Sequence, residues 1–109
     1  MQQLNPLVTR AKDGDLDAFG RLVQATQTMT CAVARSVLRD PGLAQDAVQD
    51  AYVTAFRRLR DHDEPGAFLS WLRRIVITTA INARRARRVT LLELDDDFDV
   101  PILDEAETS

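Results

Sequence analysis

The chain of 109 residues has few cysteines, glycines, prolines and aromatic residues, and it has no long apolar run. Its one cysteine, Cys31, excludes an internal disulfide scaffold. Arginines interrupt the longest apolar candidate before it reaches the roughly 20 residues that span a bilayer. Residues 1–6 lack the basic and apolar regions of a secretory signal. We therefore expect a single cytoplasmic domain with no membrane partner.

Groups that carry out catalysis or bind metals are also scarce. The chain has one histidine, His62, and neither a Ser–His nor a Cys–His pair at a spacing typical of nucleophilic catalysis. Asp46 and Asp50 lie four residues apart, which suits a di-metal site but also occurs on ordinary solvated helix faces. Phosphate-binding glycine loops are missing. We expect no catalytic residues, no metal and no cofactor, and hence no enzyme.

Arginine is abundant, and charge is distributed unevenly along the chain. Thirteen of the fourteen basic residues are arginine. Residues 93–109 contain eight acids and no base, whereas residues 1–92 contain fourteen bases and nine acids. The formal net charge of −3 therefore combines a basic body with an acidic tail. This asymmetry favours a body that binds polyanions, although a GC-rich genome by itself also raises the arginine content.

The few glycines and prolines separate long stretches with helical periodicity. The stretches that predict helices are 6–12, 16–38, 41–59 and 67–87. Asp15 and Asp40 precede the second and third helices as N-caps, and Pro41 suits a first helical position. Nothing alternates with period two over a useful length. The fold class we expect is all-α, a compact bundle of about four helices (one short N-terminal helix and three longer ones) with an acidic C-terminal tail.

Each longer helix has an apolar stripe that should face the core. In the second helix the stripe is Leu16, Phe19, Leu22, Val23, Met29, Val33 and Val37. In the third it is Leu43, Ala47, Val48, Ala51, Tyr52, Ala55, Phe56 and Leu59. In the fourth it is Phe68, Trp71, Leu72, Ile75, Thr79, Ala83 and Ala86. These stripes predict one shared hydrophobic core.

The opposite faces of the third and fourth helices are polar. The third helix carries Gln45, Asp46, Gln49, Asp50, Thr54 and Arg57 there. The fourth helix carries Arg73, Arg74, Arg84, Arg85 and Arg88, with Ile77 and Ile81 among them. A basic helix face either follows a nucleic-acid backbone or simply faces solvent. The two β-branched apolar residues within the arginines favour contact with a partner.

Three single residues have simple structural interpretations. The spacing of Trp71 from Phe68 and Ile75 favours packing in the core over stacking on a base. His62 lies in a polar stretch and is expected to be a solvated loop residue. Cys31 lies beside the apolar stripe of the second helix and is expected to pack.

Four segments follow one another as they do in the extracytoplasmic-function (ECF) sigma factors of bacterial RNA polymerase. The segments are Ala-Phe-Gly-Arg-Leu at 18–22, Leu-Arg-Asp-Pro at 38–41, Leu-Ala-Gln-Asp-Ala-Val-Gln-Asp-Ala-Tyr at 43–52 and Phe-Leu-Ser-Trp-Leu-Arg-Arg-Ile at 68–75. Residues 5–90 thus resemble the family's first helical domain, sigma region 2. Its most specific matching pieces are Asp-x-x-Gln-Asp at 46–50 and Trp-Leu-x-Arg-Ile at 71–75. The resemblance implies a transcription initiation factor that binds the polymerase core and recognises the minus-ten promoter element as melted non-template DNA.

The resemblance also implies roles for single residues. The residues implied to bind the clamp coiled coil of the largest polymerase subunit are Asp46, Gln49, Asp50, Tyr52 and Phe56. The residues implied to bind DNA are Asp61, His62, Asp63, Trp71, Arg73, Arg74, Ile77, Thr78, Ile81, Arg84, Arg85 and Arg88. The loop 61–66 would capture an unstacked base, and the arginines would follow phosphates. The family also admits an anti-sigma factor as a partner.

The sequence departs from the family pattern at several points. Val76-Ile77-Thr78 replaces a common Ala-Arg-Asn, and Asn82 replaces a common Asp, so the promoter sequence does not follow from the resemblance. A single aromatic, Trp71, where housekeeping relatives have two, predicts modest melting of the duplex.

Two other points concern domain organisation and rival functions. Residues 1–90 are expected to form the region 2-like domain and 91–109 an acidic interdomain linker, with the second, helix-turn-helix domain absent. Two alternatives stay open: a stand-alone basic DNA-binding module, and a protein-interaction domain held by an anti-sigma factor.

Overall fold

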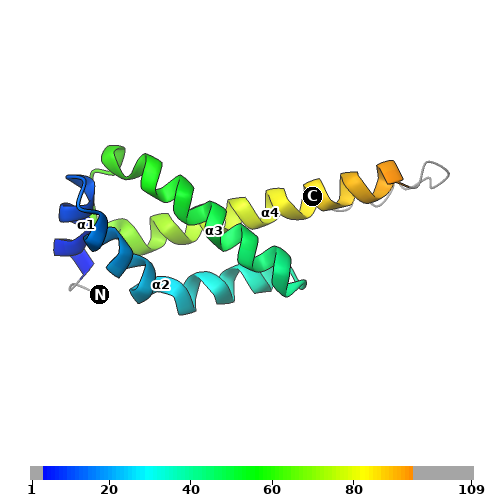
Figure 1. Ribbon diagram of the computed structural model, residues 1–109, viewed down its shortest axis with the longest axis horizontal. Helices are drawn as coiled ribbons and strands as arrows, with labels where there is room; N and C mark the ends of the chain where they lie inside the picture. Colours follow the sequence, from blue (N-terminus) through cyan, green and yellow to red (C-terminus); the bar gives the residue numbers. More distant parts are fainter. Residues whose placement is uncertain (1–3, 95–109) are drawn as a thin grey trace.

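The computed structural model describes residues 4–94, and they form a helical bundle (Figure 1). Its α-helices are α1 (Leu4–Lys12), α2 (Leu16–Val37), α3 (Pro41–Arg58) and α4 (Phe68–Leu94). Two short 3-10 turns, η1 (Leu59–Asp61) and η2 (Pro65–Ala67), connect α3 to α4. Residues 4–94 contain no strand. The expected all-α bundle of one short and three longer helices is confirmed.

The two aspartates expected to cap helices do so. Asp15 precedes α2 and accepts a hydrogen bond from the Ala18 N–H at 3.1 Å. Its other oxygen accepts two bonds from Arg10, at 3.0 Å from Nε and 2.8 Å from Nη2. The Ala18 N–H, and after it the Arg10 guanidinium, lower the pKa of Asp15 because both stabilise the charged carboxylate. Between α1 and α2 the chain turns through Gly14 at φ +98°, a conformation that a side chain would strain.

An aspartate caps the N-terminus of α3 in the same way. One oxygen of Asp40 accepts from the N–H groups of Gly42 and Leu43, at 2.8 and 3.3 Å. Pro41 occupies the first helical position, where its missing N–H costs no hydrogen bond. The predicted start of α3 is therefore confirmed.

Two predicted boundaries differ from the structure. Helix α1 begins at Leu4 instead of Pro6, and α4 continues to Leu94 instead of ending near Arg87. No glycine or proline occurs between Gly66 and Pro101, so nothing local stops α4. The expected boundary between domain and linker at 90 therefore falls inside α4. Residues 95–109 of the expected linker lie outside the described residues.

The core lies between α2, α3 and the first half of α4, and α1 packs across one end against α2 and the two 3-10 turns. On α3 it is built from small residues at helical spacing, namely Ala44, Ala47, Val48, Ala51 and Ala55. On α4 the last buried residue is Ala80. Ala83 still packs against the core, and only beyond Arg88, which lies near the α2–α3 connection, does α4 project from the bundle as a single helix (Figure 1). Ala86, expected in the core, is exposed because it lies beyond the last α4 residue that packs against the core.

The buried stripe of α2 differs from the predicted one. It consists of Ala18, Leu22, Thr26, Thr30 and Ala34. Leu16 is 67% exposed, so its assignment to the core is wrong. The apolar pattern did not predict the burial of Thr26 and Thr30, because their burial depends on a hydrogen-bonding partner in α3. That partner is Tyr52, whose hydroxyl lies 2.7 Å from Thr26 Oγ1 and 3.0 Å from Thr30 Oγ1.

Candidate polymerase and nucleic-acid interfaces

One face of α3 carries polar side chains that the core does not use. Asp46, Gln49 and Asp50 are all exposed, and their spacing of three and four residues places them side by side. They lie opposite the buried alanines of α3. The structure therefore brings three of the five predicted polymerase-binding residues together on one surface.

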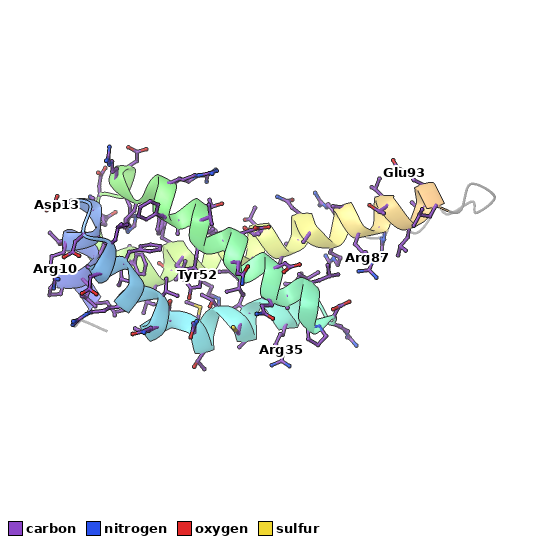
Figure 2. The ribbon with its side chains drawn as sticks, in the orientation of Figure 1. Arg10, Asp13, Arg35, Tyr52, Arg87 and Glu93 are labelled. Atoms are coloured by element: carbon purple, nitrogen blue, oxygen red, sulfur yellow. The ribbon has the colours of Figure 1, made fainter. Side chains whose placement is uncertain are left out.

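The other two predicted residues of this group, Tyr52 and Phe56, lie differently. Tyr52 is half-buried and extends its hydroxyl between the two threonines of α2 (Figure 2). Phe56 is 44% exposed, so its assignment to the core stripe is wrong. Its ring instead packs edge-on against Phe19 of α2, with the centroids 5.1 Å apart. Tyr52 thus has a packing role, whereas Phe56 offers an aromatic surface.

A groove of 440 Å³ lies between α2 and α3 beside these residues. Its lining, which defines the α2–α3 groove, is Val23, Gln27, Cys31 and Arg35 from α2 and Pro41, Ala44, Gln45, Val48, Gln49 and Tyr52 from α3. Cys31 is exposed there, which corrects its expected packing role. It follows Thr30 directly and so lies one helical row outside the buried stripe. The regular four-residue spacing of the α2 lining could have revealed this row in the sequence.

The connection between α3 and α4 folds back on the start of α4. His62 stacks on Trp71 with ring centroids 4.4 Å apart and an interplanar angle of 21°. The backbone of His62 is anchored on both sides, since its N–H donates to the Leu59 carbonyl at 3.0 Å and its carbonyl accepts from the Lys12 ammonium. His62 is consequently half-buried, and its expected role as a solvated loop residue is wrong. Trp71 packs at the edge of the core, as its spacing predicts.

A hollow of 400 Å³ lies at this stacked pair. Its lining, which defines the loop hollow, is Arg58, Asp61, His62, Asp63, Glu64 and Trp71. Nε2 of His62 is buried and has no hydrogen-bond partner within the described chain. The lining of the hollow therefore combines aromatic rings with charges of both signs. These are features that can accept a planar heterocycle and distinguish its edges.

The far side of α4 is the predicted arginine face. Arg73, Arg74, Thr78 and Arg85 are exposed, and Ile77, Ile81, Arg84 and Arg88 are half-buried. They spread from one flank of α4 to the side opposite the buried Leu72, Val76 and Ala80, and on that flank Arg84 and Arg88 also line a groove with the α2–α3 connection. From Arg73 to Arg88 the face is about 22 Å long at 1.5 Å per residue. At about 3.4 Å per nucleotide, the spacing within a stacked strand, this length matches roughly six nucleotides.

Residues 4–94 contain no cluster of three or more His, Cys, Asp or Glu side chains arranged to hold a metal ion. None of the helices in this range combines the length and apolar character needed to span a membrane.

Comparison with known proteins gives a consistent result. The family model for sigma-70 region 2 matches residues 22–90. The chain is 36% identical over 78 residues to a probable RNA polymerase sigma factor RfaY of Xanthomonas campestris, covering 72% of this chain and 20% of the relative. It is 37% identical over 86 residues to the RNA polymerase sigma-H factor of Pseudomonas aeruginosa, covering 79% and 45%. An ECF RNA polymerase sigma factor SigK of a Mycobacterium species is 29% identical over 84 residues, covering 76% and 44%.

A solved structure is also similar. The NMR structure of an engineered region 2 of sigmaE in complex with GTAAAA has a TM-score of 0.76 and 33% sequence identity, covering 81% of this chain and 92% of that chain. The chain spans less than half the length of the curated relatives that it matches. From the matched residues and the shared helical fold, we conclude that this chain belongs to the sigma-70 region 2 family and is related to the ECF RNA polymerase sigma factors.

Proposed function

We propose that this chain acts in transcription initiation as a non-enzymatic domain that binds RNA polymerase core through α3 and melted promoter DNA through the loop hollow and α4. The observation that carries the proposal is the position of the loop hollow at the start of the arginine face. Trp71, which lines the hollow, precedes Arg73 and Arg74 by two and three residues on the same helix. A base in the hollow would therefore place its own backbone beside guanidinium groups.

Stacking supports the hollow as a site for a base. Every nucleobase has a π face, and stacking on an aromatic side chain contributes about 1–3 kcal/mol per base. His62 and Trp71 supply aromatic rings of this kind to the lining of the hollow. A base in duplex DNA remains inside its stack and cannot enter, so the hollow favours melted DNA. The loop residues Asp61, His62 and Asp63 would discriminate between bases, whereas the arginines of α4 would hold phosphates.

The similar solved structure supports a nucleic-acid ligand of this kind. The engineered region 2 of sigmaE was determined with the six-nucleotide sequence GTAAAA. Six nucleotides agree with the length of the arginine face. We infer that this chain binds the minus-ten element of its promoters as non-template strand.

The face of α3 supports a protein partner. Asp46, Gln49 and Asp50 form an acidic surface beside the α2–α3 groove. A partner helix would place one row of its side chains in the groove, and basic residues beside that row would contact the acids of α3. The clamp coiled coil of the largest polymerase subunit is the partner that the family relationship favours, with Phe56 as an apolar contact. Tyr52 would then act by forming one wall of the groove.

The DNA proposal is tested by fluorescence anisotropy of labelled single-stranded GTAAAA and of the matching duplex at several salt concentrations. With three or four phosphate contacts, the logarithm of affinity should fall against the logarithm of salt with a slope of roughly −2 to −3. Arg74→Ala or Arg85→Ala should each reduce the slope by about 0.7 without changing base preference. His62→Ala should weaken binding by about 1–3 kcal/mol and alter the preferred base at one position.

Arg57→Ala is the matched control, because Arg57 is an exposed arginine of α3 that lines neither the loop hollow nor the arginine face. It should leave both slope and preference unchanged. A wild-type slope of zero, or equal affinity for duplex and single strand, would contradict the proposal. DNA binding without any affinity for polymerase core would instead support a stand-alone DNA-binding module.

A further inference from the structure

A second basic surface lies where the connection between α2 and α3 meets α4. It is a groove of 310 Å³. Its lining, which defines the corner groove, is Val37, Leu38, Arg39, Asp40 and Leu43 on one side and Arg84, Arg87 and Arg88 of α4 on the other. Arg87 extends from α4 toward this connection, and its Nη1 lies 3.9 Å from Asp40 Oδ2 (Figure 2).

The charges that line the corner groove are unbalanced. Four of its side chains are arginines, and Asp40 is the one acid among the lining residues. One oxygen of Asp40 already caps α3, and the other lies 3.9 Å from Arg87 Nη1, between side chains that are each about half exposed. A surface pair of this kind neutralises little. The lining of the groove thus contains four arginines for one acid, a composition that attracts acidic groups.

The floor of the corner groove is apolar. Among its lining residues Leu38 is buried, and Val37 and Leu43 are half-buried. A ligand that fits has acidic groups for the walls and apolar side chains for the floor. Simple phosphate backbone satisfies the first requirement but not the second.

We propose that the corner groove binds residues 95–104 of the same chain. This segment contains five acids, at 95, 96, 97, 99 and 104, and four apolar residues, Phe98, Val100, Ile102 and Leu103. Its composition matches both the walls and the floor. It also follows α4 directly, so it is present near the groove in every molecule.

The distances allow the segment to reach the groove. Leu94 ends α4 seven residues after Arg87 and ten after Arg84, which is about 10 and 15 Å along the helix axis. Ten extended residues reach about 33 Å, enough to reverse direction and pass along the groove. A short tether also gives an effective concentration in the millimolar range. Attraction between opposite charges extends about 10 Å at 0.1 M salt and about 30 Å at 0.01 M salt, so it acts over this separation at low salt.

Docking of the segment has a consequence for DNA that rests on the proposed function. Arg84 and Arg88 belong both to the corner groove and to the arginine face. An acidic segment bound to them would compete with phosphates for the same guanidinium groups. The docking itself does not depend on DNA or polymerase, so it can be tested separately.

The test uses the full chain with Cys31→Ser and a nitroxide attached at Ala106→Cys, observed by amide NMR with the label oxidised and reduced. At low salt we expect amides of residues 37–43 to lose more than half of their intensity when the label is oxidised. Amides of α1, at the other end of the bundle, should keep theirs. Residues 37–43 are the informative reporters, because the end of α4 lies near the label whether or not the segment docks.

Three comparisons decide the outcome. The loss at 37–43 should disappear at 1 M salt, where the screening length is about 3 Å. It should also disappear in the Asn variant, which combines Asp95→Asn, Asp96→Asn, Asp97→Asn and Asp99→Asn. Arg39→Ala should reduce it, while Arg57→Ala, of equal charge change but outside the groove, should not. Loss confined to α4, or unchanged in the Asn variant, would overturn the proposal. Chains without the nitroxide can also be observed in a mixture with nitroxide-labelled chains. Equal loss at 37–43 in that mixture would assign the groove to a second copy and also overturn the proposal.

The consequence for DNA is measured with the same Asn variant and the GTAAAA probe. The variant should bind several-fold more tightly than wild type at low salt and equally at high salt. Equal affinity at low salt with docking intact would overturn the competition. Absence of any GTAAAA binding would count against the proposed function and leave the NMR result standing on its own.

Discussion

Replacing Tyr52 with phenylalanine should destabilise the domain although the ring and its packing are retained. The hydroxyl that is lost lies 2.7 Å from Thr26 Oγ1 and 3.0 Å from Thr30 Oγ1. Both threonines are almost completely buried, with exposures of 2% and 0%. Water therefore cannot replace the missing group without opening the contact between α2 and α3.

The magnitude follows from the bonds that remain. Thr26 Oγ1 still donates to the Leu22 carbonyl at 2.8 Å, and Thr30 Oγ1 to the Gln27 carbonyl at 3.2 Å. Neither hydroxyl hydrogen is left without an acceptor, so the full penalty for an unsatisfied buried group does not arise. The Tyr52 hydroxyl has one hydrogen, so it donates to one of the acceptors near it, namely the two threonine oxygens and the Val23 carbonyl at 3.4 Å. About one neutral hydrogen bond is therefore lost, at a net value of about 0.5–1.5 kcal/mol. We expect the free energy of unfolding to fall by about 0.5–1.5 kcal/mol, and for a domain of this size each kcal/mol lowers Tm by about 4–8 °C.

Urea denaturation followed by circular dichroism and by Trp71 fluorescence measures this change. Asp50→Asn, an exposed change on the same helix, is the control and should remain within about 0.5 kcal/mol of wild type. A double-mutant cycle with Thr26→Val should give a coupling energy on the order of 1 kcal/mol. A Tyr52→Phe variant as stable as wild type, or a coupling energy of zero, would refute the reasoning and leave the Tyr52 hydroxyl available for a partner.

Two further predictions concern the acids of α3 and the glycines of α2 and its preceding turn. Asp46→Arg with Asp50→Arg should abolish co-purification with polymerase core while changing stability by about 0.5 kcal/mol or less, as expected for exposed sites. The matched reversal Asp13→Arg in the α1–α2 turn should leave binding intact, and core binding by the folded double variant would contradict the proposed interface. Gly14→Ala should cost about 1–2 kcal/mol because its φ of +98° disfavours a side chain. Gly20 lies in a helix with no atom near an added Cβ, so Gly20→Ala should instead stabilise the domain by roughly 0.5–1 kcal/mol. Thermal unfolding measures both glycine variants, and a shift of Tm in the same direction for both would refute these predictions.

Local features of the sequence were sufficient to predict most of the helical framework. The starts of α2 and α3 follow from Asp15, Asp40 and Pro41, because capping and proline geometry depend only on the next few residues. The exposed faces of α3 and α4 follow from helical periodicity. The family was also recognisable, since its segments are contiguous in the chain. The roles of single site residues in binding polymerase or DNA stay predictions.

Other features depend on contacts between segments that are distant in the sequence. Thr26 and Thr30 look like surface residues until the hydroxyl of Tyr52 meets them from α3. His62 looks like a loop residue until η1 turns it onto Trp71. In both cases a polar or aromatic group is stabilised by one particular partner, and periodicity carries no information about that partner.

The grooves illustrate the same division. The sequence alone determined that the body is basic, that the tail is acidic and that α4 has an arginine face. Only the tertiary structure decided that Arg39, from the α2–α3 connection, joins Arg84, Arg87 and Arg88 around an apolar floor. The physical reason is that a charge pattern along the chain is additive and local, whereas a binding surface requires side chains from separate helices to be held together by the packing of the core.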